Sequence, residues 1–392
     1  MHIQDFIRNN GLQEAVDKWH LKTNETEHYT QLNYDMIETP RGVPECDECR
    51  GLILDKSDWS IAARSFNRFY NENEGFSAKF DHTAGVLQEK VDGTLVMVWW
   101  DKYQEKLVCS TRGRIFADGG VGNAETSTFS GSVKTFSELF FDTAKKINPE
   151  FVTILSKELQ GIPFFSLRNG GITLVFELYG PENRVLTPYE ESGLVLIGGR
   201  FLSNTCEIAP ETLDDISKVI GVRRPHTYRF TSTKDIHDLL GTLDPKDEGF
   251  VLTDYRFTIE GSIQRVKIKN PRYLALSKLV KAGDSEGMSV KHVISLIKLG
   301  DAEEVISYFP EYKDKILDLK QKFVTLGDVI DRDYHRIHHI ENRKEFAIEA
   351  QKCQVSHGLY MLKDGRAKSG MDFLMTVKDD TLLSMLDKVC IK

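Results

Sequence analysis

The sequence has no long apolar run and no secretion signal, and these two absences exclude whole classes of protein. A membrane-spanning helix needs roughly 20 consecutive apolar residues, whereas the longest apolar stretch here covers only residues 94–100. Residues 1–5 have neither the basic start nor the apolar core of a secretion signal. We therefore expect a soluble protein of the cytoplasm, in a cell or in one that a virus has taken over.

Cysteine is also scarce. Six cysteines in 392 residues do not form a disulfide framework, and a reducing compartment would keep them as thiols. Cys46 and Cys49 form a Cys-x-x-Cys pair, but no second pair at a matching distance accompanies it. A zinc ribbon needs such a second pair, so we favour two ordinary thiols near a strand.

Positive charge is not in excess. The chain carries 51 lysines and arginines against 59 aspartates and glutamates, a formal net charge of −8. This balance argues against a surface that coats itself with nucleic acid by bulk electrostatics, although it permits a local basic groove. Hydrophobic residues make up 40% and charged residues 28% of the chain, which is typical of folded proteins, and the length suggests two domains.

The order of apolar patterns predicts an α+β protein in two parts. Short apolar or β-branched segments bounded by turn residues predict antiparallel strands at 51–54, 94–100, 172–176 and 249–252. Apolar residues at helical spacing predict one helix across 133–147 and only helices after Pro271. We place the boundary near 276, which gives a strand-rich domain of residues 1–276 and a helical domain of residues 277–392.

Lys90 is a candidate nucleophile. It follows a β-like run and precedes Asp92-Gly93, a tight-turn pair, after which a second β-like run begins. A lysine amine is a nucleophile only when deprotonated, so a site must lower its pKa from about 10.4. Most lysines before an Asp-Gly turn are merely solvated, so this short motif has many chance matches.

Two glutamates stand beside apolar strands. Glu177 follows Phe176 and points to the opposite face of the strand. It either faces solvent, or accepts hydrogen bonds from a sugar hydroxyl, or coordinates a hydrated metal. Glu248 precedes the strand at 249–252, next to Gly249, which permits close approach of a ligand. A plain turn before a strand is the alternative for Glu248.

A later segment places two lysines on one face of a strand. Val266 and Ile268 alternate with Lys267 and Lys269, so the two ammonium groups share one side and repel each other unless an anion compensates them. A triphosphate would supply that anion, and the same positive field would lower the pKa of a nearby nucleophilic lysine. The alternative is a solvated edge strand with protective lysines.

In this order and at these separations, the four segments resemble the covalent nucleotidyltransferase superfamily of ATP-dependent ligases and capping enzymes. The nearest likeness is to the phage RNA ligase 1 family. Two further stretches, 48–53 and 63–71, look like that family's sequence upstream of the lysine. The likeness covers residues 30–276 clearly and the helical tail only weakly.

The resemblance implies a role for each matching residue. Lys90 would form a lysyl-adenylate with AMP from ATP, and Glu177 would contact the ribose. Glu248 would hold Mg²⁺, or Mn²⁺ in its place, through water. Lys267 and Lys269 would hold the phosphates.

Five further residues complete the implied ATP site. Arg50 would touch the nucleotide or its phosphates, and Arg112 would add positive charge near them. The implied set also includes Arg68, Tyr70 and Glu89. Arg68 and Tyr70 stand where the family more usually shows Lys and Phe, and arginine keeps the charge with a different fork geometry.

The resemblance implies an ATP-dependent RNA ligase that joins RNA 5′-phosphate and 3′-hydroxyl ends through lysyl-AMP and adenylated RNA. A DNA ligase should carry a β-rich oligonucleotide-binding domain after the two-lysine strand, whereas helices follow here. The helical tail therefore favours RNA, plausibly a broken tRNA, and we expect a monomer. The alternatives are a DNA ligase, a capping-type nucleotidyltransferase, and an inactive RNA-binding member of the fold.

The tail contains two features that invite a functional interpretation. His335 and His339 lie four residues apart, beside His338, a spacing that suits a metal on a helix. Nearby arginines and the absence of an obvious third ligand favour a structural, solvated or RNA-facing surface instead. Four lysines could contact phosphate, although a charged exposed helix face is the ordinary explanation: Lys278, Lys281, Lys291 and Lys298.

Overall fold

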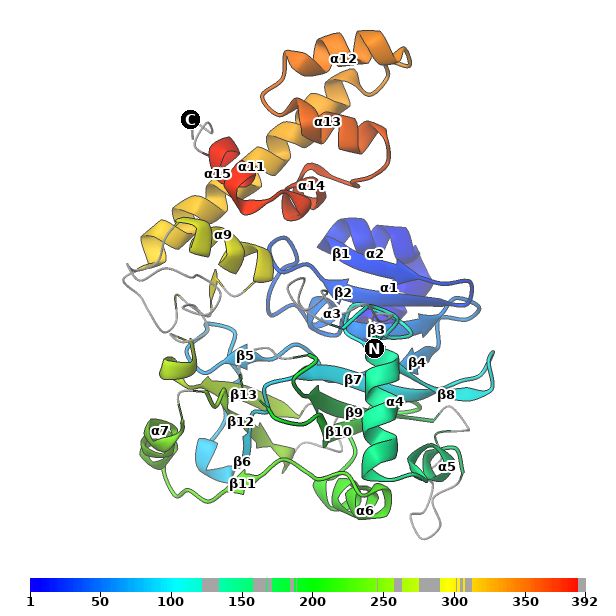
Figure 1. Ribbon diagram of the computed structural model, residues 1–392, viewed down its shortest axis with the longest axis vertical. Helices are drawn as coiled ribbons and strands as arrows, with labels where there is room; N and C mark the ends of the chain where they lie inside the picture. Colours follow the sequence, from blue (N-terminus) through cyan, green and yellow to red (C-terminus); the bar gives the residue numbers. More distant parts are fainter. Residues whose placement is uncertain are drawn as a thin grey trace. The chain divides into compact units, whose positions relative to one another are not determined.

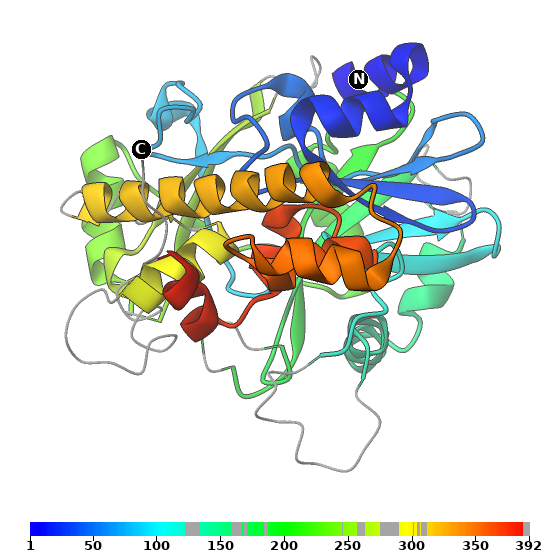
Figure 2. The same cartoon turned by 90° about the horizontal axis from the view of Figure 1, so that it is seen from above.

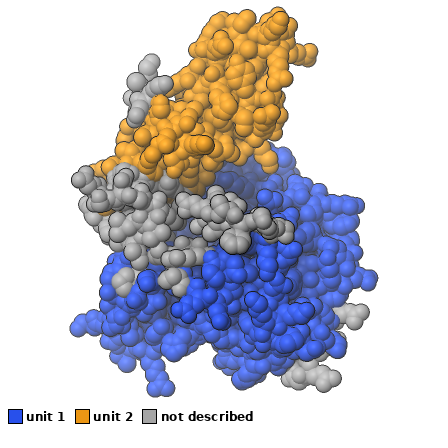
Figure 3. Space-filling model, viewed as in Figure 1, with its two compact units in different colours: residues 1–277 blue, residues 278–392 orange. Residues whose placement is uncertain are grey.

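The chain forms two compact units, residues 1–277 and 278–392 (Figure 3). The computed structural model describes residues 1–121, 134–157, 167, 171–183, 187, 189–244, 246–256, 263–274, 290–300, 302–303, 306 and 312–386. Lys278, Lys281 and the expected boundary at 276 lie outside these residues, and that boundary stays a prediction. Among the described helices, none has the length and apolar character needed to cross a membrane.

The first sheet of unit 1 is antiparallel and lies under two amphipathic helices. Its order is β1 (Leu21–Glu25), β2 (Tyr29–Tyr34), β3 (Arg50–Asp55) and β4 (Ile61–Ala63). The covering helices are α1 (His2–Asn10) and α2 (Leu12–Trp19), and the short α3 (Pro44–Asp47) precedes β3. Ile7 and Trp19 pack on Leu52 in this core, where Cys46 and Cys49 are buried free thiols.

The second sheet forms the largest core of unit 1. Its order is β10 (Gly193–Phe201), β9 (Ile172–Tyr179), β7 (Thr94–Asp101) and β8 (Lys106–Thr111), all antiparallel. Packed on it are α4 (Phe136–Ile147), α5 (Phe151–Leu155) and α6 (Pro210–Ile220) (Figure 1). The helix predicted across 133–147 begins at Phe136 because Thr135 and Glu138 form a capping box; residue 133 lies outside the described residues.

In the third sheet, three strands have ends that lie close together. Its order is β11 (Thr227–Tyr228), β6 (Val86–Glu89), β12 (Gly249–Asp254), β13 (Gln264–Lys269) and β5 (Tyr70–Asn71). Only β13 and β5 pair in parallel within it. The 3₁₀ turn η1 (His82–Ala84) precedes β6, and α7 (Thr233–Thr242) packs on the apolar face. Phe250 pairs with Glu89, and Gly249 pairs with Lys269, so the ends of β6, β12 and β13 meet.

The described part of unit 2 is helical and contains no strand. Its helices are α9 (Val290–Leu299), α11 (Lys313–Ile337), α12 (Arg343–Gln351), α13 (Ser356–Lys363), α14 (Gly370–Thr376) and α15 (Asp379–Leu386). Figure 2 shows α11 as the long helix on which the shorter ones pack, and Phe323 and Ile330 are among its buried residues. The predicted fold class, antiparallel sheets followed by a helical region, is confirmed.

Two tail lysines that could contact phosphate already bind carboxylates inside unit 2. Lys298 Nζ lies 2.6 Å from Asp379 Oδ1 and 2.5 Å from the carbonyl oxygen of Val377. Lys291 pairs with Asp380. Both lysines connect α9 to α15, so these ion pairs hold two helices of unit 2 together.

Candidate active site

The site lies where β6, β12 and β13 end. The backbone N–H of Lys90, one residue beyond β6, donates to the carbonyl oxygen of Gly249 at 2.8 Å. Gly249 has φ +126°, and a Cβ there would collide with the carbonyl oxygen of Ile268. Only glycine adopts this backbone conformation without strain, so Gly249 lets three strand ends come together beside Glu248.

Glu248 lies between two lysines. Its Oε2 is 2.5 Å from Lys90 Nζ, and its Oε1 is 3.0 Å from Lys269 Nζ. The side chain is buried, which alone would raise its pKa, but Lys90 and Lys269 together lower that pKa to about 2. Glu248 is therefore a carboxylate at neutral pH, and it joins the candidate nucleophile to a candidate phosphate-binding lysine.

Glu177 carries the second carboxyl group of the site. On β9 it pairs with Leu95 and Val195, while its neighbour Phe176 enters the core on the opposite face. Burial raises the pKa of Glu177 to about 8, against the opposing effect of Lys90, with Glu248 raising it further. A largely protonated carboxyl can donate as well as accept a hydrogen bond at neutral pH.

Asp92 holds the turn after Lys90 from both sides. Its Oδ1 accepts from the Tyr273 hydroxyl at 2.8 Å, and its Oδ2 accepts from the Thr187 N–H at 2.8 Å. The sequence predicted only a tight turn at Asp92, and neither partner was recognised. These bonds tie the turn after Lys90 to two distant segments of unit 1.

Two cations face the ring of Phe69. Arg50 Cζ lies 5.1 Å and Lys267 Nζ 4.9 Å from the ring centroid, a cation–π distance. Arg50 Nη1 is buried and has no hydrogen-bond partner. Because a buried unpaired donor is costly, this Nη1 suits an oxygen of an anionic ligand. Phe69 was not singled out from the sequence, although it lies between Arg68 and Tyr70.

Tyr34, also not recognised from the sequence, links two predicted arginines. Arg68 Cζ lies 4.1 Å from its ring centroid, and Arg112 Nη1 donates to its hydroxyl at 3.4 Å. Tyr70 is tied down differently, because its hydroxyl donates to Asp47 Oδ1 at 2.5 Å and accepts from the backbone N–H of Gly42 at 2.8 Å. The aromatic rings thus fix the directions of both guanidinium groups.

The carboxylate of Glu89 is already bound. It pairs with Arg223 and accepts from the backbone N–H of His226 at 2.9 Å. Its side chain therefore holds the segment before β11, and the proposed contact of Glu89 with ATP stays a prediction.

No group of three or more His, Cys, Asp or Glu side chains arranged for a metal ion occurs in the described part of the chain. This finding includes the tail histidines, where His338 Nδ1 lies 2.8 Å from the carbonyl oxygen of His335. A metal at the site would therefore need oxygen ligands from water or substrate in addition to protein carboxylates.

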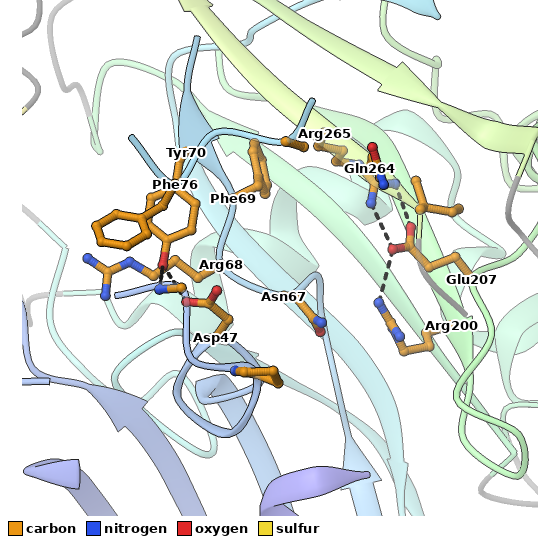
Figure 4. A pocket seen from close by; sticks show the side chains of 14 residues that line it. Asp47, Asn67, Arg68, Phe69, Tyr70, Phe76, Arg200, Glu207, Gln264 and Arg265 are labelled. Atoms are coloured by element: carbon orange, nitrogen blue, oxygen red, sulfur yellow. Dashed lines mark hydrogen bonds and ion pairs between the residues drawn. The ribbon is translucent and has the colours of Figure 1, made fainter. Parts of the chain in front are cut away.

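A cavity of about 480 Å³ opens beside β5 and β13 (Figure 4). Arg68, Phe69 and Tyr70 line one part of it, and Gln264 and Arg265 line another. Lys90, Glu177 and Glu248 do not line this cavity. The cavity is therefore separate from the site that contains Lys90, Glu177 and Glu248.

A family model described as RNA ligase matches residues 48–273. The chain belongs to this RNA ligase family. The match spans the first sheet from its third strand, the Lys90 turn and the two-lysine strand, and it confirms the prediction of the phage RNA ligase 1 family and of an RNA ligase as the class of enzyme.

Two viral proteins are similar in sequence to this member of the RNA ligase family. It is 27% identical over 333 residues to a presumed bifunctional polynucleotide kinase/RNA ligase of Autographa californica nuclear polyhedrosis virus, covering 81% of this chain and 43% of that protein. It is 24% identical over 344 residues to an RNA ligase of Rhodothermus phage RM378, covering 74% and 72%. The chain thus spans less than half of the baculovirus relative. A solved archaeal ATP-dependent RNA ligase (form 2) matches with a TM-score of 0.47 at 13% identity, covering 81% and 78%.

Proposed function

We propose that this chain is an ATP-dependent RNA ligase in which Lys90 accepts AMP from ATP and passes it to an RNA 5′-phosphate. The observation that carries the proposal is the Glu248 carboxylate held between Lys90 Nζ and Lys269 Nζ. A nucleophile, a carboxylate and a phosphate-binding cation at one sheet edge are the groups that nucleotidyl transfer requires.

In the first transfer, Lys90 Nζ attacks the α-phosphorus of ATP. A nitrogen–phosphorus bond forms, and the bond to the pyrophosphate oxygen breaks. Lys267, Lys269 and Arg50 bind the phosphates, because they present positive charge on the same side of unit 1. Arg112 adds charge beside them.

Glu248 has a second part in this step. Its carboxylate pairs with Lys90 Nζ, and the same carboxylate would hold a metal ion beside the attacking amine. Mg²⁺ fits this place, because it commonly binds one or two carboxylates and completes its shell with water and phosphate oxygens. When bound, such an ion would neutralise phosphate charge, and Mn²⁺ has the same ligand preference for oxygen.

Glu177 is the group we assign to the ribose. Its carboxyl lies in the electrostatic field of Lys90 and Arg50, and it projects from β9 on the face opposite the core. A partly buried carboxyl gains most from a ligand that both donates and accepts, as a ribose hydroxyl does.

The two remaining transfers use RNA. The 5′-phosphate attacks the lysyl-bound AMP and releases the Lys90 amine, and the 3′-hydroxyl then attacks the adenylated phosphate and releases AMP. Lys90 is covalently needed only for the first two transfers. RNA supplied with an adenylated 5′ end therefore bypasses it.

The helical unit is the part that we assign to substrate choice. The described residues after β13 contain helices and no strand, so they supply no β-rich oligonucleotide-binding domain. We propose that this unit favours a structured RNA such as a tRNA broken in its anticodon loop. A monomer and a cytoplasmic location stay predictions.

Covalent labelling tests the proposal. The chain is incubated with Mg²⁺ and ATP labelled on the α-phosphate, or with GTP labelled likewise, and the adduct is separated by denaturing electrophoresis. We expect an AMP adduct on the unaltered chain and on Lys106→Ala, whose lysine is exposed on β8, and none on Lys90→Ala. Lys90→Ala should still join pre-adenylated RNA.

Two outcomes would overturn the assignment. An adduct on Lys90→Ala would show that another residue is the nucleophile, and a GMP adduct would identify a capping-type enzyme. Nicked DNA and single-stranded RNA with a 5′-phosphate are then compared as substrates, and preferential sealing of DNA would contradict the RNA assignment.

A further inference from the structure

The cavity beside β13 has an aromatic wall with an exposed edge. Phe76 is 54% exposed, and its ring lies 5.8 Å from that of Tyr70 at an angle of 46°. Gly42, with φ +71°, packs against Phe76, since a Cβ there would collide with the ring. The position of Phe76 is therefore held by its neighbours, although half of its surface faces solvent. A held, exposed aromatic ring is suited to stack on a flat ligand.

Two residues that line the cavity have buried polar atoms without partners. Arg68 Nη1, a donor, and Gln264 Oε1, an acceptor, are buried and form no hydrogen bond. A ligand that satisfies both must offer an acceptor and a donor. A phosphate or pyrophosphate offers acceptors only, whereas a nucleotide offers phosphate oxygens together with ribose hydroxyl and base amino groups.

Most of the other charged lining is paired within the protein (Figure 4), although Arg200 Nε is also buried without a partner. Glu207 accepts from Arg200 at 2.9 Å and from Arg265 at 2.7 and 2.5 Å. The charged lining residues are three arginines and two carboxylates, which leaves one positive charge: Arg68, Arg200, Arg265, Asp47 and Glu207. That surplus matches a single phosphodiester, so it favours one nucleotide of a strand over a triphosphate.

The cavity adjoins the predicted ATP phosphates through Phe69. This ring lines the cavity, and Lys267 and Arg50 both lie at cation–π distance from it. β5, which contains Tyr70, pairs in parallel with β13 next to Lys267. A nucleotide in the cavity would therefore lie beside the phosphate-binding cations and not in the Lys90 and Glu248 site.

We propose that this cavity binds one ribonucleotide of the RNA substrate. Its base stacks on Phe76 and Tyr70, its phosphate accepts from Arg68, and a ribose hydroxyl or base amino group donates to Gln264. This inference rests on the proposed function and adds a place for the RNA strand. A guanidinium has five donors, so this use of Arg68 is compatible with its predicted contact with ATP.

Phe76→Ala and Gln264→Leu test the proposal in the full chain. RNA affinity is measured by fluorescence anisotropy with a labelled single-stranded RNA, and joining is measured with pre-adenylated RNA. Covalent labelling by ATP is followed separately. We expect Phe76→Ala to weaken RNA binding about tenfold, the usual loss when a stacking ring is removed, with ATP labelling within about twofold of the unaltered chain.

Matched variants separate recognition from folding. Phe76→Trp keeps a stacking ring and should retain RNA affinity, and Gln264→Glu keeps an acceptor and should bind better than Gln264→Leu. Val152→Ala removes a comparably exposed apolar side chain on α5 (43% exposed) and should change neither readout.

Each outcome decides the matter. Unchanged RNA affinity in Phe76→Ala and Gln264→Leu overturns the proposal, and so does a parallel loss of ATP labelling, which would make the cavity part of the ATP site. If the unaltered chain takes no label from ATP but Phe76→Ala still loses RNA affinity, the proposed function fails and the RNA site stands.

Discussion

Glu248 shows how one buried carboxylate can serve two cations. Its two oxygens contact Lys90 and Lys269 separately, and a buried charge that loses its partners is costly. Neutralising Glu248 would leave both lysines facing each other without an anion between them. The Glu248 side chain therefore compensates the positive charge of both lysines, independently of any nucleotide.

Glu177 should make stability depend on pH in a defined window. Burial raises its pKa from the ordinary 4.5 to about 8 in the folded chain, so between these two pH values the folded state holds a proton that the unfolded state has lost. Stability contributed by this group therefore falls as pH rises through the window. We expect Glu177→Gln to remove this dependence.

The measurement is the free energy of unfolding at several pH values for the unaltered chain and for Glu177→Gln. Their difference should change by at most about 1.4 kcal/mol per pH unit, with the glutamine variant relatively more stable at the upper end. Glu14→Gln, an exposed residue of α2, is the control. Two parallel curves would refute a raised pKa at Glu177.

Some site residues could be recognised from the sequence and others could not. Lys90, Glu248, Lys267 and Lys269 stand in short motifs whose order along the chain is informative. Asp92 was recognised only as part of a turn, because its partner Tyr273 is 181 positions away. Such a contact depends on three-dimensional packing, which a local pattern does not encode.

The strand ends that form the site depend on the backbone at Gly249. Gly249→Ala would place a Cβ against the Ile268 carbonyl in a conformation that side chains rarely adopt, which costs about 1–3 kcal/mol. We expect a lower melting temperature and a loss of AMP labelling of tenfold or more, because Glu248 and Lys90 flank this residue.

Gly241→Ala is the matched control. Gly241 lies in α7 and a Cβ there would meet nothing within 4 Å, so this change should be neutral or stabilising by up to about 1 kcal/mol. If Gly249→Ala melts and labels like Gly241→Ala, the close packing at this sheet edge is not required.

The predictability of the elements follows their length and pattern. β7 and β9 carry long apolar runs and were expected from the sequence. β5 has two residues and pairs in parallel with β13, and no periodicity marks so short a strand. The cavity next to β5 was unforeseen for the same reason.

For the whole molecule, the helical unit should affect substrate choice and not the chemistry of the first transfer. We expect a chain lacking residues 280–392 to form the AMP adduct and to lose its preference for broken tRNA over linear RNA by tenfold or more. The two RNAs are compared by initial rates of joining.

The full chain with Lys298→Ala, which breaks a contact inside unit 2, controls for simple loss of stability. A truncated chain that keeps the full preference would remove the helical unit from substrate choice. A truncated chain that forms no adduct would show that the unit is needed for the first transfer.

The pairing of Lys90 with Glu248 also bears on how durable the enzyme is in the cell. Cells contain acylating and carbamoylating compounds, which modify amines that carry a free lone pair. An ammonium held at 2.5 Å by a buried carboxylate offers none. Under the proposed function, this ion pair therefore keeps the Lys90 amine from reacting with such compounds, and only a bound nucleotide or metal would free it.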